Sequence, residues 1–200
     1  FAKIITDHGF KFIGPKYEHI HKMANKIEAK SIAKKVGLPI LPGSSDNVLD
    51  YLEAKSIAES IGYPIIIKST NGGGGRGIKV VLKEKELKNS FLLAKKEAEL
   101  SFGSNQVYIE KYLSNPRHIE IQVLCDNQGN AVHLGERECS IQRRNQKIIE
   151  ECPSPAISDN ERKRICEITI KAMKKIGYFN IGTVEYLYSD GNFFFMEMNT

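Results

Sequence analysis

Hydrophobic residues recur along this chain at two spacings, and each spacing predicts a different kind of element. Over residues 19–37 they recur every three or four positions and the segment closes on Gly37, which predicts one amphipathic helix. The same spacing predicts helices over about 50–61, 83–100 and 158–177. The last of these opens with Ser158 and Glu161, the residue pair of a capping box.

Strands are predicted where apolar residues alternate with polar ones or form short runs between turn residues. Such segments end at Lys68 and cover about 78–82 and 106–113. Residues 116–141 predict two strands around the turn "DNQGN", and 182–199 predict a hairpin with Asp190 and Gly191 at its tip. Helices interleaved with antiparallel hairpins predict an α+β fold. The Pro/Gly/Ser-rich connector "LPILPGSSDN" predicts a domain boundary near residue 40.

The composition is that of a globular protein, with 41% hydrophobic and 26% charged residues among 200. The net charge of +5 is mild and the lysines are scattered among acidic residues, which points weakly to anionic ligands and not to nucleic acid. No apolar run approaches the roughly 20 residues that span a membrane. Because the chain starts in what reads as mid-domain sequence and stops directly after a strand, we expect a fragment of a longer protein.

The cysteines predict a reducing compartment, either the cytoplasm or the matrix of an organelle such as a plastid or mitochondrion. Cys125, Cys139, Cys152 and Cys166 are 13 or 14 residues apart and form no C-x-x-C pair. This spacing predicts reduced, buried thiols, with a metal site as the alternative.

The stretch "YPIIIKSTNGGGGRGIKVV" (63–81) places five glycines within six residues, between two apolar strands. A flexible linker is one reading, but linkers do not lie so close between two such strands. A P-loop requires lysine after its last glycine, where this chain has Ile78. Gly72, Gly74 and Gly77 match the dinucleotide fingerprint, but that fingerprint requires a helix next, and "IKVVL" is strand sequence.

The remaining interpretation is a strand–loop–strand flap laid over phosphates, as in kinases. Glycines allow backbone N–H groups to approach phosphate oxygens without intervening side chains. Lys68, at the end of an otherwise apolar strand, would supply a positive charge to the same phosphates. Gly-rich hairpins are only moderately specific, so this hypothesis needs support from the rest of the chain.

Acidic and amide side chains near the C-terminus predict a metal site. In "FFFMEMN", strict alternation places Phe193, Phe195, Glu197 and Asn199 on one face of the strand. Glu185 lies among apolar residues of the paired strand. Two carboxylates and an amide oxygen at one point suit Mg²⁺ that bridges phosphates. The alternative is that both glutamates face solvent on an edge hairpin.

Two further segments carry polar patterns. In "NPRHIEIQ" the residues His118, Glu120 and Gln122 share one face, which predicts either a lined cleft or a solvated surface. The segment "ERECSIQRRNQKIIEE" (136–151) mixes arginines and Lys147 with glutamates and lacks aromatic residues. It therefore fits a small-anion site better than a nucleic-acid surface.

These segments together resemble one family. "KSTNGGGGRGIKVV", "YIEKYLSNPRHIEIQVL", "ERECSIQRRNQKIIEE" and "GTVEYLY…FFFMEMNT" closely resemble biotin carboxylase, the ATP-grasp component of acetyl-CoA, propionyl-CoA, methylcrotonyl-CoA and pyruvate carboxylases. The resemblance extends in order over essentially all 200 residues. It implies ATP-dependent carboxylation of biotin on a carrier protein, with bicarbonate activated as carboxyphosphate.

The resemblance also implies roles for individual residues. Lys147 matches a residue near bicarbonate, and Glu185, Glu197 and Asn199 match ligands of Mg²⁺ or Mn²⁺. The implied ATP contacts, which include two of these glutamates, are Lys26, Lys68, Gly74, Gly75, Glu110, Lys111, Tyr112, Leu113, His118, Asn145, Glu185 and Glu197. Asn145 departs from the family, because many members carry a nucleotide-contacting histidine there, and this weakens its assignment.

The implied architecture is an ATP-grasp fold, with a small glycine-loop lid and part of a larger antiparallel-sheet core. Residues 1–40 would end a preceding α/β domain, 41–112 would form the lid, and 113–200 would begin the core. The implied partners are ATP, bicarbonate, a biotinylated carrier protein or domain and a carboxyltransferase, with a homo-oligomeric parent and neither nucleic acid nor membrane. The family's catalytic arginine and glutamate match no residue of this chain, so we expect it to be inactive alone. Another ATP-grasp ligase, or a nucleotide-binding module without turnover, is the alternative.

Overall fold

The structure of the chain is a computed structural model, and it describes residues 1–71 and 77–200. It divides into two compact units. The large unit comprises Phe1–Ile40, Pro116–Gln142 and Lys147–Thr200. The small unit comprises Leu41–Asn115 and Arg143–Gln146. The assignment of 1–40 to a preceding domain stays a prediction.

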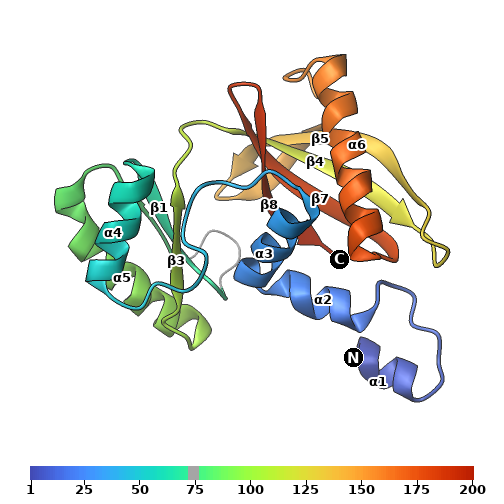
Figure 1. The fold of residues 1–200 in the computed structure, drawn as a ribbon, viewed down its shortest axis with the longest axis horizontal. Coiled ribbons are helices and arrows are strands. Elements are labelled where there is room, and N and C mark those ends of the chain that lie inside the picture. Colours follow the sequence, from blue (N-terminus) through green and yellow to red (C-terminus); the bar gives the residue numbers. More distant parts are fainter. Residues whose placement is uncertain (72–76) are drawn as a thin grey trace. The chain divides into compact units, whose positions relative to one another are not determined.

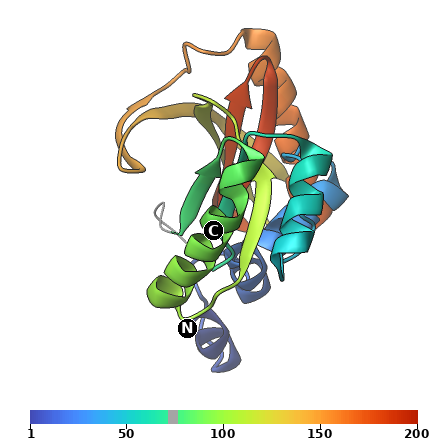
Figure 2. The same cartoon turned by 90° about the vertical axis from the view of Figure 1, so that its left-hand side faces the viewer.

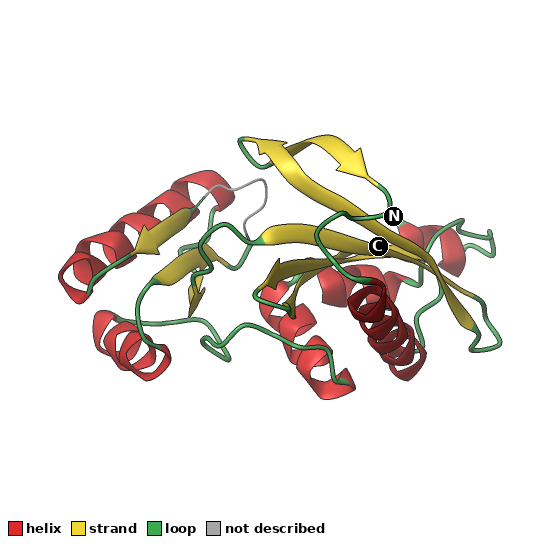
Figure 3. Cartoon of the chain, turned by 90° about the horizontal axis from the view of Figure 1, so that it is seen from above, coloured by secondary structure: helices red, strands yellow, loops and turns green. Residues whose placement is uncertain are grey.

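The large unit is built around a five-stranded antiparallel sheet with the strand order β6-β5-β4-β7-β8 (Figure 1). Helices α2, α3 and α6 contact this sheet or one another, and Figure 3 shows its strands in yellow and the helices in red. The elements of this unit, including the end residues that β5 and β6 contribute to the small unit, are α1 (Ala2–Asp7), α2 (Tyr17–Ala24), α3 (Lys26–Val36), β4 (Arg117–Cys125), β5 (Ala131–Arg143), β6 (Gln146–Glu151), α6 (Asp159–Ile176), β7 (Asn180–Ser189) and β8 (Asn192–Asn199).

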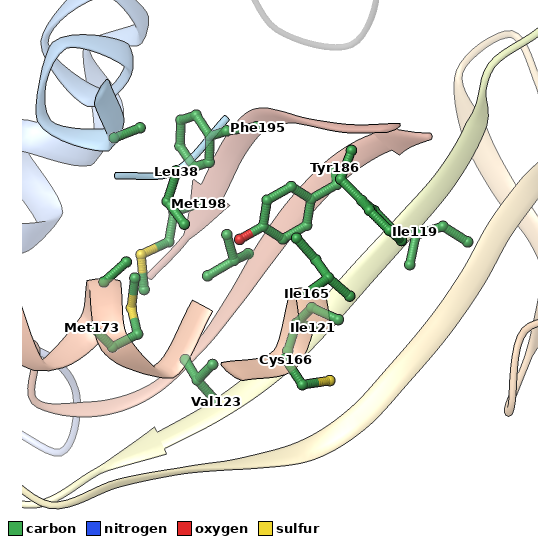
Figure 4. Packing of buried hydrophobic residues seen from close by; sticks show 14 of the residues in the cluster. Leu38, Ile119, Ile121, Val123, Ile165, Cys166, Met173, Tyr186, Phe195 and Met198 are labelled. Carbon is green, nitrogen blue, oxygen red and sulfur yellow. The ribbon is translucent and has the colours of Figure 1, made fainter. Parts of the chain in front are cut away.

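One face of this sheet packs against the helices and forms the core (Figure 4). Ile119 and Ile121 of β4 are completely buried there, and full burial of such a side chain contributes roughly 1.5–3 kcal/mol. Tyr186 is also completely buried, and its hydroxyl lies 2.7 Å from the Thr169 hydroxyl of α6, so neither polar atom lacks a partner. The alternate residues of β4 therefore point to the opposite face of the sheet.

The long helix predicted over 19–37 is two helices, so that prediction was wrong. Asn25 separates α2 from α3, and its backbone is extended there. Its side chain accepts hydrogen bonds from the N–H groups of Ile27 (3.0 Å) and Glu28 (3.1 Å), which makes it the N-cap of α3. The apolar spacing continues across this break, and therefore the spacing alone does not reveal it.

A β-bulge in β8 overturns the predicted arrangement of its faces. Tyr186 pairs with Phe195, but Glu185 pairs with Glu197, so Met196 is an extra residue on β8. Phe193, Phe195 and Met198 consequently lie in the core. Glu197 is on the opposite face from these phenylalanines, not on the same face as predicted. The predicted hairpin turn at Asp190 and Gly191 is confirmed, and both residues have positive φ.

The small unit is a three-stranded antiparallel sheet, β2-β1-β3, packed against two helices (Figure 2). Its buried residues include Ile65 and Ile67 of β1 and Leu87 and Phe91 of α5. The elements of this unit are α4 (Tyr51–Ile61), β1 (Ile65–Ser69), β2 (Ile78–Val81), α5 (Glu84–Phe102) and β3 (Val107–Lys111). Helices and antiparallel strands in both units confirm the α+β class.

All four cysteines are free thiols. Cys125, Cys139 and Cys166 are buried as predicted, but Cys152 is exposed, because it follows the end of β6 on the surface. Among the helices in the described part of the chain, none combines the length and apolarity needed to cross a membrane.

Candidate functional site

A row of charged side chains runs across four strands of the large unit. Arg137 of β5 pairs with Glu120 of β4, Glu120 pairs with Glu185 of β7, and Glu185 pairs with Glu197 of β8. Paired residues of adjacent strands share a face, so all four point away from the core. Like charges directly opposite each other are destabilising. Three neighbouring carboxylates therefore require cations close by.

Glu120 is the most enclosed carboxylate of the row, at 2% relative exposure. Its Oε1 accepts a hydrogen bond from Arg137 Nε at 2.6 Å, and its Oε2 accepts one from Lys147 Nζ. Arg137 Nη1 also donates to Gln122 Oε1 at 3.0 Å. A buried carboxylate bound by two cations is charge-compensated and holds both cations at defined positions.

Glu185 is 3% exposed and lies among three polar groups. Its Oε1 accepts hydrogen bonds from Lys147 Nζ (3.0 Å) and Asn199 Nδ2 (2.6 Å), and its Oε2 lies 2.8 Å from His118 Nε2. Burial alone would raise the pKa of Glu185, but His118 and Lys147 outweigh burial and lower this pKa to about 2. The carboxylate is therefore ionised at neutral pH.

Lys147 links the two buried carboxylates. Burial would lower its pKa, but the carboxylates of Glu120 and Glu185 outweigh burial and raise the pKa well above its ordinary value. Lys147 is therefore a cation at neutral pH. The other nitrogen of His118, Nδ1, lies 2.8 Å from the Gln142 side-chain amide, which orients the imidazole ring.

Glu197 is the more accessible end of the row, with a side chain that is 35% exposed. Its Oε2 lies 3.5 Å from Nζ of Lys26, the first residue of α3. The structure therefore brings together Lys26, His118, Lys147, Glu185, Glu197 and Asn199 in the large unit. Glu185 and Glu197, predicted to lie on the two paired strands of this hairpin, are directly opposite each other in the strand register.

The donor set at Glu185, Glu197 and Asn199 fits a hard divalent cation. Mg²⁺ prefers oxygen ligands and is usually held by one or two carboxylates, with phosphate or water in its remaining positions. Glu185 and Glu197 are directly opposite each other, and a Mg²⁺ ion between them would relieve their mutual repulsion. His118 and Glu120 also lie close to Glu185, with ligand atoms within 4.8 Å of one another. The imidazole nitrogen of His118 suits Mg²⁺ less well than the carboxylates do.

Lys68 and Glu110 form the central polar contact of the small unit. Lys68 Nζ lies 2.8 Å from Glu110 Oε2, and the two side chains are only 16% and 8% exposed. Two strands bring them together: β1 carries Lys68 and β3 carries Glu110. A lysine already paired with a buried carboxylate is held with its charge at the end of β1, adjacent in sequence to the glycine loop.

The segment after Glu110 is anchored by its backbone and by one side chain. Lys111 N–H donates to Pro42 O (2.8 Å) and Tyr112 N–H donates to Pro64 O (3.1 Å). The Lys111 ammonium donates to the carbonyls of Gly62 and Tyr63, both at 3.0 Å. The side chain of Lys111 therefore stabilises the small unit, whereas Leu113, half-buried just past β3, is the residue at which the segment leaves the sheet.

Three further positions are predicted to contact the nucleotide. Gly74 and Gly75 lie outside the described residues. Asn145 is the second residue of the two-residue turn between β5 and β6, and it has a φ of +64° after Arg144 at +52°. Asparagine is enriched at positive φ, so the turn explains why asparagine is well tolerated at this position.

Glu120 and Arg137 are the residues that sequence reasoning missed. The predicted polar face of β4 already contained Glu120, and the charged segment 136–151 contained Arg137. The signal was the alternation of His118, Glu120 and Gln122, which left open a cleft or a solvated face. Because Glu120 is buried, this face of β4 is an enclosed polar cluster and not a solvated surface.

Comparison with known proteins agrees with this geometry. Residues 25–200 match the family described as carbamoyl-phosphate synthase L chain, ATP binding domain. The chain is 49% identical over its full length to a pyruvate carboxylase of Staphylococcus aureus and to a biotin carboxylase of Allochromatium vinosum, and it covers 17% and 45% of them. The chain thus spans less than half the length of these relatives.

Solved structures show the same fold. The biotin carboxylase–β-γ-ATP complex from Campylobacter jejuni has a TM-score of 0.94 and 46% identity, and the chain covers 45% of it. The biotin carboxylase domain dimer of Hydrogenobacter thermophilus 2-oxoglutarate carboxylase, with MgADP, ADP and bicarbonate, has a TM-score of 0.94 and 45% identity, with 44% covered.

The fold and the charged row thus define an ATP-binding domain of the ATP-grasp class. The chain belongs to the carbamoyl-phosphate synthase L chain, ATP binding domain family. Within that family its relatives bear the names biotin carboxylase and pyruvate carboxylase, which confirms the resemblance drawn from the sequence motifs.

Proposed function

We propose that this chain binds ATP with Mg²⁺ and forms the nucleotide-binding part of a biotin carboxylase. The observation that supports this most directly is the pairing of Glu185 with Glu197 across β7 and β8, with Asn199 beside them. Two opposed carboxylates on a sheet face, close to Lys147 and His118, suit a cation that carries phosphates. The relatives whose structures contain MgADP or an ATP analogue support the same assignment.

In the large unit, the proposed metal ligands are Glu185, Glu197 and Asn199, with Mg²⁺ as the preferred cation and Mn²⁺ as a substitute. When bound, the metal neutralises phosphate charge during phosphoryl transfer. Lys26 and His118 are proposed contacts to the nucleotide. Lys147, held as a cation by Glu120 and Glu185, is proposed to attract bicarbonate.

In the small unit, Lys68 is proposed to place its charge near phosphate, held by Glu110. The glycine loop, with Gly74 and Gly75, is proposed to cover the phosphates. We propose that the adenine base of ATP contacts the backbone of Glu110, Lys111, Tyr112 and Leu113. The N–H groups of Lys111 and Tyr112 already donate hydrogen bonds within the unit. Leu113, which lies just past β3, is then the preferred backbone contact. Asn145 is proposed as a weaker nucleotide contact.

For the parent protein we propose carboxylation of biotin on a carrier protein or domain, through carboxyphosphate, and onward transfer by a carboxyltransferase. Residues beyond this chain complete that reaction, because the chain spans 45% of a biotin carboxylase relative. A homo-oligomeric parent in the cytoplasm or an organelle matrix is proposed from the resemblance and the free thiols. The carboxyltransferase would determine which acyl-CoA or keto acid receives the carboxyl group.

The proposal can be tested by calorimetry of ATP binding with and without Mg²⁺. Mg²⁺ should tighten ATP binding by wild type, and couplings of this kind are typically about 5- to 150-fold. Glu197→Gln keeps the side-chain shape but removes the charge, so most of this gain should be lost. Glu151→Gln is the matched control, because Glu151 is an exposed carboxylate of β6. If Glu197→Gln keeps the full effect of Mg²⁺, Glu197 is not a ligand.

A further inference from the structure

A groove lies along the edge of β5 in the large unit, away from the charged row. Residues 131–133 form one wall, and the opposite wall is a single stripe of α6 made by Glu167, Ile170, Lys171 and Lys174. The groove has a volume of ≈ 480 Å³. The α6 residues are spaced three or four apart, so they share one side of the helix next to its core-facing side.

The first residues of β5 form a free edge. β5 is 13 residues long, whereas β6 has six residues and follows β5 after a two-residue turn. β6 therefore pairs only with the C-terminal half of β5, and no described strand flanks 131–134 on that side. A bulge at Leu134 and Gly135, where Gly135 has a φ of +88°, ends this edge.

The side chains of this edge do not block pairing. Exposed edges are blunted by lysine, proline or inward-pointing charge, and also by bulges such as the one that ends this edge. Here Val132 and Leu134 are 52% and 64% exposed, and the edge residues 131–134 include neither lysine nor proline. Val132 pairs with Leu124, which pairs with Ile181, and these two are 41% and 54% exposed. An apolar row thus reaches the free edge on the face opposite α6.

The two faces at this edge differ in chemistry. Val123 faces the core and pairs with His133, so His133 lies on the α6 side, where Lys171 and Lys174 outnumber Glu167. Side chains of an added strand alternate between faces. The groove side therefore favours acidic side chains, which would lie above the aliphatic side chain of Ile170. The opposite side favours apolar side chains.

We propose that the free edge of β5 and the α6 stripe bind an extended, acidic segment of a partner protein by strand addition. Main-chain hydrogen bonds to 131–134 would give affinity, and alternating acidic and apolar side chains would give specificity. A second copy of this chain fits less well. Two β5 edges paired about a two-fold axis would bring the lysines of both α6 helices toward the same sheet face, where they repel.

The test uses a labelled hexapeptide of alternating valine and glutamate, capped at both ends, titrated by fluorescence anisotropy against the chain. Wild type should bind it at least about tenfold more tightly than the valine–lysine peptide. N-methylation of the four central amides should abolish binding, because it removes the donors for strand pairing. Amide chemical-shift changes should centre on 131–134.

Charge reversal distinguishes this site from general attraction to a basic chain. Lys171→Glu with Lys174→Glu should invert the preference toward the valine–lysine peptide, a gain that misfolding cannot produce. Lys85→Glu with Lys96→Glu makes the same charge change at exposed positions of α5 and should leave the preference intact. Equal binding of both peptides, binding of the N-methylated peptide, shifts centred elsewhere, or self-association of the chain through β5 would each overturn the proposal.

Discussion

Replacing Glu120 by glutamine removes the carboxylate that both Arg137 and Lys147 contact, without changing the shape of the side chain. Glu120 is 2% exposed, while the side chains of Arg137 and Lys147 are 30% and 27% exposed. Breaking a fully buried ion pair costs about 3–5 kcal/mol, because a charge is left without compensation. Here both cations reach partial solvent and keep second partners, so we expect about 2–3 kcal/mol loss in the free energy of unfolding.

Glu150→Gln provides the matched comparison, because Glu150 contacts the same guanidinium from an exposed position. Its Oε2 lies 3.4 Å from Arg137 Nε, and its side chain is 46% exposed. Exposed pairs contribute about 0–1 kcal/mol. Urea titration followed by circular dichroism suits this chain, which has no tryptophan. Equal destabilisation by the two variants would refute the view that burial, not ion pairing as such, sets the magnitude.

Three other substitutions are predicted to have distinct effects. Lys68→Ala should weaken ATP binding by about 1.5–3 kcal/mol, the range for hydrogen bonds to charged groups, and equal calorimetric affinities would exclude Lys68 from the site. Asn25→Ala should cost about 1 kcal/mol by removing the N-cap of α3, whereas an unchanged urea midpoint would show that the cap contributes nothing. Burial raises the pKa of Glu136, but Arg162 and the Ser154 N–H outweigh it, so the net pKa lies below the ordinary 4.5. Its stabilisation is therefore present above pH 4.5 and lost as the pH falls below, and Glu136→Gln should flatten the unfolding free energy between pH 5 and 3, relative to wild type.

Local signals predicted the parts of the fold that local chemistry controls. The Ser158–Glu161 capping box and the turn at Asp190 and Gly191 form as predicted, because each depends on residues only a few positions apart. Counting outward from that turn predicted that Glu185 and Glu197 lie opposite each other or one pair apart, and the bulge at Met196 makes them direct partners.

The missed features depend on contacts between distant segments. Met196 becomes an extra residue only because β8 must match both the core and the carboxylate of β7, and alternation along β8 alone does not contain that requirement. In the sequence Glu120 looks like an ordinary polar residue of a strand. Only its contacts with β5, β6 and β7 in the folded unit show that it is enclosed. The break between helices at Asn25 was not predicted, because the apolar pattern of α2 continues into α3.

The extra residue in β8 also affects the direction of the strand. If Met196 were deleted, Phe195 would still face the core and Glu197 would still face Glu185, because regular alternation would then give the same faces. A β-bulge bends its strand and increases the local twist, so the deletion would straighten β8 beyond Phe195. The bulge therefore sets the angle at which β8 crosses the carboxylate of Glu185. A single-residue deletion would keep the row of charges paired while changing the course of the strand that carries Glu197 and Asn199.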